Sequence, residues 1–333
     1  MGSKRIGPEP IMRLTTGHWS LKALAAAVDL GIFNCLQGTP MPVSTLAEAL
    51  QLPERSLERL LDANAALGFL EKHDRVYENA EIAGVYLVEG FPDYLGDFVR
   101  LAGVYGFAKW TRFEDCIKSD TPVEDLDDDF RNSEERMQYF IRAMHNNAKG
   151  PARLLSEVAS LETRSHLLDL GGGSGVYAIA ATERHQRLQA TLVDFSPVCK
   201  VAREFVQTSV AQDRIAIVEG DLLADELDLS GDVVLLSQVL HNMSAADSMK
   251  LIERCYEWTR PGGIVVLHEF VLDDDRAGPL YPALFALNML ITTTGGNAHT
   301  GSELAGWLRS GGFEQISVHD TPGPSTFVVG QKP

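Results

Sequence analysis

The sequence predicts an α/β protein in which a mostly parallel, seven-stranded sheet follows a smaller and mainly helical N-terminal domain. The first observation is that short aliphatic runs alternate with helical segments from Arg164 onward, a pattern typical of a parallel sheet covered by helices on both faces. The second is that residues 20–89 hold three helical segments and then two short strand-like runs. The third is the length of 333 residues, about twice a typical domain of ~150 residues.

The N-terminal part has the element order of a winged helix. The segments Leu21–Leu36, Ser44–Leu50 and Pro53–Leu67 are predicted as helices, and Phe69–Glu71 with Val76–Tyr77 as the two strands of a wing. Between residues 41 and 80, four basic and seven acidic side chains give a net charge of −3. A DNA-binding domain needs the opposite sign, so packing or dimerisation is the favoured role.

The net charge of the whole chain also argues against binding to nucleic acid. It has 46 acidic against 29 Lys and Arg residues, a net charge of −17, which disfavours nucleic acid and membrane surfaces as partners. The uncharged stretch Tyr281–Thr294 is shorter than the ~20 residues of a membrane span. Met1–Pro10 has no apolar signal region, and the four cysteines are widely spaced. These features predict a cytoplasmic protein without a disulfide frame or a structural metal.

We expect three parts: a winged-helix domain over 1–90, a helical linker over 91–161, and the α/β domain over 162–333. Within the linker, the acidic run Asp125–Asp129 is expected to be a solvated loop. It could bind calcium, but it lacks the spacing of an EF-hand. Seven aliphatic runs mark the strands of the last part, of which the final two are expected to form an antiparallel hairpin: 166–170, 190–193, 215–218, 233–236, 264–267, 315–319 and 326–329.

The most informative segment is the glycine-rich sequence Asp169-Leu-Gly-Gly-Gly-Ser-Gly175 between a strand and a helix. Glycines there permit a sharp turn and let a ligand lie against backbone N–H groups at a helix N-terminus. The next strand ends at Asp194, 19 residues after Gly175, where a carboxylate can accept both hydroxyls of a ribose. Asp221 and Leu222 follow the third strand and could flank an adenine. The pattern predicts a nucleoside cofactor.

With these motifs the sequence resembles the S-adenosylmethionine (SAM)-dependent O-methyltransferases of plant and bacterial secondary metabolism, of the caffeate and hydroxyneurosporene type. The resemblance covers nearly the whole chain and rests on the motifs 169–175, 193–194, 220–222, 239–242, 260–263 and 287–290 with the pair 295–296. It implies a Rossmann-like methyltransferase domain, a winged-helix dimerisation domain and a homodimer. It also implies SAM as cofactor, S-adenosylhomocysteine (SAH) as product, and no metal.

In that family the glycines of the loop receive the methionine part of SAM. The resemblance implies that Asp194 holds the ribose and that Asp221 and Leu222 frame the adenine. Ser237 stands where many relatives have a lysine that contacts the cofactor. The candidate cofactor-binding residues are therefore Asp169, Gly171, Gly173, Gly175, Asp194, Asp221, Leu222 and Ser237.

His241 stands where the family places its general base, at the carboxyl end of a strand predicted over Val233–Leu240. A hydroxyl loses its proton as its oxygen attacks the methyl group, and a neutral imidazole titrates in the range this requires. The alternative is an inert histidine that caps the end of a strand.

The sequence departs from the plant members around this base. Ala298 occupies a position where they carry an acid, and the last strand, Thr326–Gly330, offers none. Glu269 or His299 could orient His241 instead, although both could be purely structural. A tryptophan and a serine of the family are replaced by Met243 and Ala148.

The acceptor pocket is expected between the linker helices and the edge of the sheet. Met and aromatic residues at helical spacing could equally be ordinary core, whereas a polar amide within an apolar helix must find a partner, which makes Asn288 the most informative. The candidate lining residues are Phe140, Met144, Asn147, Met243, Phe285, Asn288, Met289 and Thr292.

These features together predict transfer of a methyl group from SAM to a hydroxyl of a small aromatic or polyketide-like metabolite. Two alternatives stay open. A family member can use bound SAM for hydroxylation, decarboxylation or cyclisation, and the missing acids leave room for this. A winged-helix regulator that senses SAM is the second, and the net charge of its domain speaks against it. The sequence does not name the acceptor.

Overall fold

The computed structural model describes residues 7–123, 125–126 and 133–333, and the chain divides into two compact units, 1–108 and 109–333. The segment 91–161, which the sequence predicts as a linker, is thus shared between the units, and the boundaries at 90 and 161 stay predictions. Most of the acidic run Asp125–Asp129 lies outside the described residues. None of the helices in the described part of the chain combines the length and apolar character that crossing a membrane requires.

The first unit is mainly helical, with a small antiparallel sheet of order β1-β3-β2. Buried side chains such as Phe33, Leu57, Leu61 and Tyr77 form its core. Its elements are α1 (Glu9–Thr15), α2 (Gly17–Asp29), α3 (Ile32–Cys35), β1 (Met41–Pro42), α4 (Val43–Leu50), α5 (Glu54–Ala66), β2 (Leu70–His73), β3 (Val76–Asn79), α6 (Glu81–Tyr86), α7 (Gly96–Arg100) and the π-helix η1 (Leu101–Gly106), and α8 (Phe107–Trp110) crosses into the second unit.

The predicted order of three helical segments and a two-stranded wing is present, with one correction. The segment Leu21–Leu36 is not one helix, because Gly31 has φ +71° and separates α2 from α3. Only glycine adopts such a left-handed conformation at little cost, so it ends a helix readily. In the wing, Arg75 Nη2 lies 2.6 Å from Glu54 Oε1 and Lys72 Nζ lies 2.5 Å from Asp62 Oδ1, so cations of the wing pair with acids of α5.

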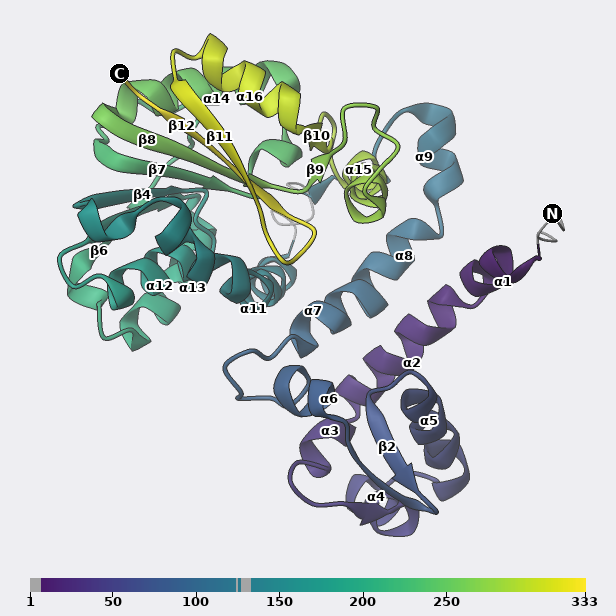
Figure 1. The fold of residues 1–333 in the computed structure, drawn as a ribbon. Helices are drawn as coiled ribbons and strands as arrows, with labels where there is room; N and C mark the ends of the chain where they lie inside the picture. The colour runs from purple at the N-terminus through teal and green to yellow at the C-terminus, as the bar shows by residue number, and fades with distance from the viewer. Residues whose placement is uncertain (1–6, 124, 127–132) are drawn as a thin grey trace, which may run out of the picture. The chain divides into compact units, whose positions relative to one another are not determined.

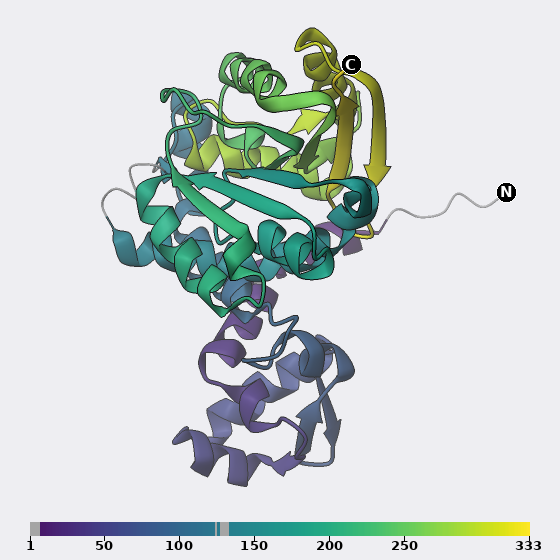
Figure 2. The ribbon, with the colours of Figure 1, turned by 90° about the vertical axis from the view of Figure 1, so that its left-hand side faces the viewer.

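The second unit contains the predicted seven-stranded sheet, with strand order β11-β12-β8-β7-β4-β5-β6 (Figures 1 and 2). The strands β8, β7, β4, β5 and β6 run parallel, and β12 and β11 complete the sheet as an antiparallel hairpin. The strands are β4 (His166–Leu170), β5 (Gln189–Asp194), β6 (Ile215–Glu219), β7 (Gly231–Ser237), β8 (Thr259–Glu269), β11 (Glu314–Asp320) and β12 (Thr326–Gln331), and a separate parallel pair is formed by β9 (Val271–Leu272) and β10 (His299–Thr300).

Helices cover both faces of this sheet (Figure 1). Leu167 of β4 packs towards α11 and α12, whereas Leu168 packs towards α14 and α16. Both side chains are at most 1% exposed, which explains why the strands read as continuous aliphatic runs. The remaining elements of this unit are α9 (Phe113–Ser119), α11 (Glu134–Val158), η2 (Leu161–Thr163), α12 (Val176–Arg184), α13 (Ser196–Thr208), η3 (Gln212–Arg214), η4 (Leu240–Asn242), α14 (Ala245–Trp258), α15 (Leu280–Thr292) and α16 (Gly301–Ser310).

Candidate active site

The glycine-rich loop joins the end of β4 to the start of α12. Gly171, Gly173 and Gly175 have φ values of +65°, +58° and +78°, a left-handed conformation that side chains disfavour. A Cβ added at Gly171 would lie 2.8 Å from Val239 Cγ2, so this end of the loop is packed against the segment that follows β7. A Cβ added at Gly173 would meet no atom within 4 Å. The loop therefore presents bare backbone to open space beside the N-terminus of α12.

Asp194, at the end of β5, is tied to this loop. Its Oδ2 accepts a hydrogen bond from Gly173 N at 2.9 Å, and its Oδ1 accepts one from Phe195 N at 2.7 Å. Burial raises the pKa of Asp194 to about 6, against the effect of these two hydrogen bonds. A carboxylate held at the centre of the loop can serve a ligand that lies on it.

Asp169 faces the interior of the domain. Its side chain is 1% exposed, and its Oδ2 accepts a hydrogen bond from Ala178 N at 3.2 Å in the first turn of α12. Burial raises the pKa of Asp169 to about 7. The contacts of this residue fix the start of α12 behind the loop.

The carboxyl ends of β6 and β7 lie at the same edge of the sheet as the glycine-rich loop. After β6, Asp221 Oδ1 accepts hydrogen bonds from Leu223 N at 2.7 Å and Ala224 N at 3.1 Å, which closes a turn, and Leu222 is half-buried against the core. At the end of β7, Ser237 Oγ lies 2.9 Å from His268 Nδ1.

His241 does not end a strand, in contrast to the prediction. The strand β7 ends at Ser237, the chain turns at Gln238 with φ +59°, and His241 lies in the short helix η4. Its side chain is buried, with 7% of the residue exposed. The turn carries the imidazole past the end of the strand to the next strand, β8.

Glu269, the last residue of β8, is the partner of this histidine. Its Oε2 lies 2.6 Å from His241 Nδ1, and its Oε1 accepts hydrogen bonds from Val239 N at 3.0 Å and Leu240 N at 2.9 Å. Burial acts to raise the pKa of Glu269, but its electrostatic interaction and hydrogen bond with the His241 imidazole, together with the nearby His268 and His299, outweigh burial and hold the pKa below its usual range. Of the two candidates for orienting His241, Glu269 makes the contact, whereas His299 packs edge-to-face on Trp307 with ring centroids 4.6 Å apart.

A cluster of aromatic side chains lies next to the His241–Glu269 pair. Phe285 of α15 meets the His241 ring edge-on, with centroids 4.8 Å apart and an interplanar angle of 88°. Phe270 lies 4.6 Å from Phe285 and 4.8 Å from Tyr281, again between ring centroids. Of these three residues, only Phe285 is among those predicted from the sequence to line the acceptor pocket. Two signals were available: Phe270 follows Glu269 directly, and Tyr281 precedes Phe285 by one helical turn.

Comparison with known proteins decides the family. An O-methyltransferase domain matches residues 127–314, which is more than half of the chain. An O-methyltransferase dimerisation domain matches residues 12–89. The chain belongs to the O-methyltransferase family.

Similar proteins span the full length of this methyltransferase. The 3-hydroxy-5-methyl-1-naphthoate 3-O-methyltransferase of Streptomyces sahachiroi is 33% identical over 98% of this chain and 95% of its own. The tetracenomycin polyketide synthesis 8-O-methyl transferase of Streptomyces glaucescens is 30% identical over 98% and 97%. The structure of human N-acetylserotonin methyltransferase in complex with SAM is 26% identical, with a TM-score of 0.89 over 100% of this chain and 99% of that one. The present chain is a SAM-dependent O-methyltransferase.

The residues of the loop fit this cofactor. The open space over Gly173 leaves room for a ligand against the backbone, and the carboxylate of Asp194 stands beside it. Asp221 and Leu222 follow β6, and Ser237 is the last residue of β7, at the same edge of the sheet. Their individual roles in holding SAM stay predictions, as does the expectation that no metal takes part.

Of the residues predicted to line the acceptor pocket, Phe285 is in ring contact with His241. Phe140 packs in a cluster between α11 and α13, and Met243 packs against the core on the α14 side. Thr292 donates from its hydroxyl to the carbonyl of Asn288 at 2.8 Å. The acceptor roles of these side chains stay predictions, together with those of Met144, Asn147 and Met289, of which the first two are half-buried on α11 and the third is buried on α15.

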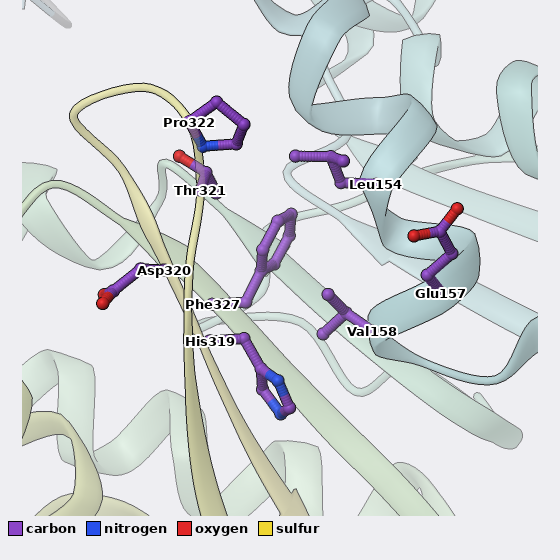
Figure 3. Close-up of a pocket in the computed structure, with 8 residues that line it drawn as sticks. All are labelled: Leu154, Glu157, Val158, His319, Asp320, Thr321, Pro322 and Phe327. Carbon is purple, nitrogen blue, oxygen red and sulfur yellow. The ribbon is translucent and has the colours of Figure 1, made fainter.

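A cavity of about 300 Å³ lies elsewhere in the methyltransferase unit, between the C-terminal part of α11 and the β11–β12 hairpin (Figure 3). It contains none of the predicted site residues. Its lining residues are Leu154, Glu157, Val158, His319, Asp320, Thr321, Pro322 and Phe327. The glycine-rich loop, Asp194 and the His241–Glu269 pair do not line this cavity.

Proposed function

We propose that this enzyme methylates a hydroxyl of a small aromatic, polyketide-type metabolite, with His241 as general base and Glu269 as the residue that orients it. The 2.6 Å hydrogen bond between His241 Nδ1 and Glu269 Oε2 carries the proposal. The proposed acceptor class is supported by the relatives from Streptomyces, which are named for a hydroxynaphthoate and a polyketide.

Glu269 determines which nitrogen of His241 acts. An ionised carboxylate can only accept hydrogen bonds, so Nδ1 donates to it and the neutral ring carries its lone pair on Nε2. When bound, SAM supplies a methyl group already activated by a positively charged sulfur. The remaining tasks of the protein are to position the acceptor and remove its proton. Nε2 takes the proton of the acceptor hydroxyl, and the carboxylate of Glu269 stabilises the imidazolium that results.

Glu269 is suited to this task because it stays ionised. A buried carboxylate is costly unless it is paired and hydrogen-bonded. Here two backbone N–H groups satisfy Oε1 and the histidine satisfies Oε2. The backbone donors belong to Val239 and Leu240, so Glu269 fixes the turn that carries the base as well as its ring.

For the cofactor, we assign the methionine part of SAM to Gly171, Gly173 and Gly175, the ribose to Asp194, and the adenine to Asp221 and Leu222. Ser237 is a further polar contact at the end of β7. Asp169 contributes indirectly in this proposal. Its carboxylate accepts a hydrogen bond from Ala178 N inside the domain and so fixes the first turn of α12 behind the loop.

For the acceptor, the cluster of Phe270, Tyr281 and Phe285 offers aromatic surface directly beside the base. Aromatic rings pack favourably by their edges and offset faces, so the cluster suits a flat aromatic acceptor. The residues Phe140, Met144, Asn147, Met243, Asn288, Met289 and Thr292 complete the proposed pocket.

The enzyme is also proposed to be a homodimer. The match of residues 12–89 to a dimerisation domain supports this, and so do the exposed apolar side chains of α1 and α2, such as Leu14 and Trp19 at 82% and 64% exposure. Light scattering of the purified chain would give twice the monomer mass, and the monomer mass would overturn the assignment.

The activity is tested by incubating the protein with SAM carrying a labelled methyl group and a panel of hydroxynaphthoates and simple phenols. We expect label in one or more acceptors, as SAH accumulates. Tight SAH binding with no label transferred to any acceptor would instead favour hydroxylation, decarboxylation or cyclisation with the same cofactor. Failure to bind either SAM or SAH would overturn the proposal as a whole.

A further inference from the structure

The proposed reaction leaves one contact of the glycine-rich loop unexplained. His145, in the middle of α11, lies with its Nδ1 2.8 Å from Ser174 Oγ. Ser174 stands between Gly173 and Gly175 and is 3% exposed. It is the one residue from 171 to 175 with a side chain, so this hydrogen bond is a side-chain tether on an otherwise bare loop.

A second contact fixes the orientation of the His145 ring. It stacks on Phe205 of α13, with ring centroids 4.0 Å apart and an interplanar angle of 15°. The guanidinium of Arg142 lies 5.5 Å from the centre of the Phe205 ring and pairs with Glu204. Two helices thus determine where the imidazole points, and it points to Ser174.

The protonation state of His145 suits such a tether. Burial, together with the nearby charges of Lys149 and Arg142, lowers the pKa of His145 to about 4. The ring is therefore neutral near neutral pH. A neutral imidazole both donates and accepts, so it can share one hydrogen bond with a hydroxyl without adding charge beside a cationic cofactor.

The tether matters because a glycine-rich loop loses much conformational entropy when it becomes ordered. Glycine has more accessible backbone conformations than any other residue, and four of the five residues from 171 to 175 are glycine. A loop that is ordered before the ligand arrives spends less of the binding free energy on ordering.

We propose that His145 is a positioning residue for SAM, which holds the glycine-rich loop in its binding conformation through Ser174. The inference rests on the proposed site for the cofactor. The competing explanation is a packing contact between α11 and the loop that contributes to folding but not to binding.

Two substitutions separate the polar contact from the packing. His145→Phe keeps a ring for stacking on Phe205 but removes the atom that bonds Ser174, and Ser174→Ala removes the partner. His145→Asn keeps a polar atom close to the position of Nδ1. We expect His145→Phe and Ser174→Ala each to weaken SAH binding about five- to twentyfold, the effect of one hydrogen bond. The double variant should be no weaker than either, and His145→Asn should recover most of the affinity.

The chain offers a matched control. Ser156 of α11 and His185, which follows α12, form the same kind of hydrogen bond, with Ser156 Oγ 3.0 Å from His185 Nε2, away from the loop. Ser156→Ala should lower the melting temperature as much as Ser174→Ala while leaving the affinity for SAH unchanged. In turnover, His145→Phe should raise the KM for SAM by the factor seen in binding and change kcat by less than about threefold.

Calorimetry with SAH and thermal unfolding of each variant decide the matter. If His145→Phe and Ser174→Ala lower the melting temperature but bind SAH like the wild type, the contact is packing and the inference is overturned. Additive losses in the double variant would also overturn it, because the two residues would then act independently. If the wild-type protein itself gives no heat with SAH, the proposed cofactor site fails, and that outcome is distinct from both.

Discussion

Gly171 and Val239 touch where the two halves of the proposed site meet: a Cβ on Gly171 would lie 2.8 Å from Val239 Cγ2. The contact joins the glycine-rich loop to the segment that carries His241 two residues later. Gly171 also has φ +65°, a conformation in which side chains are strained. The glycine-rich loop can therefore pack this closely against the segment that carries His241 only because position 171 has no side chain.

The first prediction tests this contact. Gly171→Ala should weaken SAH binding about tenfold or more, since backbone strain of about 1–3 kcal/mol adds to the clash with Val239 and both are relieved only if the loop moves. Gly306→Ala is the control, because a Cβ added at Gly306, inside α16, would meet no atom within 4 Å, and alanine there should be neutral or stabilising. Calorimetry with SAH measures the effect, and equal affinities for both variants would contradict the prediction.

The second prediction concerns the base. His241→Ala should lower kcat by about 10²–10⁴ with little change in SAH affinity, because in the proposed mechanism the imidazole removes a proton but does not hold the cofactor. Glu269→Gln should also lower kcat, since an amide cannot stabilise the imidazolium, and it can present an N–H to His241 in place of the acceptor that fixes the Nδ1–H tautomer. Single-turnover assays with the labelled methyl group measure both. A His241→Ala enzyme with full activity would eliminate the assignment.

The sheet could be predicted from the sequence because its central strands β4, β5, β7 and β8 are local aliphatic runs that are buried on both faces. The loop and Asp194 were predictable for a similar reason, since they immediately follow such runs. The break at Gly31 was missed because apolar residues continue on both sides of it, and only the left-handed backbone there ends the helix.

The partner of His241 could not be settled from the sequence. Glu269 lies 28 residues away and reaches His241 because β7 and β8 are neighbours in the sheet and the chain turns at Gln238 after β7 ends. The resemblance to the plant enzymes pointed instead to acids at other positions, which this chain lacks. The side of the pocket formed by Phe270 and Tyr281 also depends on how α15 packs beyond β8, which no local pattern specifies.

The third prediction is a pH dependence of cofactor binding. Because burial raises the pKa of Asp194 to about 6, this carboxylate gains a proton just below neutral pH and can then no longer accept two hydroxyl hydrogen bonds. SAH binding should weaken by up to about tenfold for each pH unit below that value. Asp194→Asn should bind weakly at every pH, with a flat profile over this range. A wild-type profile as flat as that of the variant would contradict the proposed contact.

The fourth prediction concerns His268, which faces the opposite side of β8 from Glu269. Its Nδ1 lies 2.9 Å from Ser237 Oγ and 3.0 Å from Tyr177 OH, and its Nε2 lies 2.8 Å from Ser325 Oγ. The ring is 2% exposed. His268→Leu would leave these hydroxyls without their shared partner inside the domain and should cost about 1–3 kcal/mol of unfolding free energy.

The same residue should give the protein an acid-sensitive component of stability. Burial lowers the pKa of His268 to about 4, from about 6.5 in an unfolded chain. Between these values the unfolded state binds a proton that the folded state refuses, so the contribution of His268 is present above about pH 6.5 and is lost as the pH falls toward 4. Urea unfolding of wild type and His268→Leu near neutral pH and near pH 5 measures this. The difference in stability between the two proteins should shrink at the lower pH, because only the wild type carries this penalty, and a difference that grows on acidification would refute the assignment.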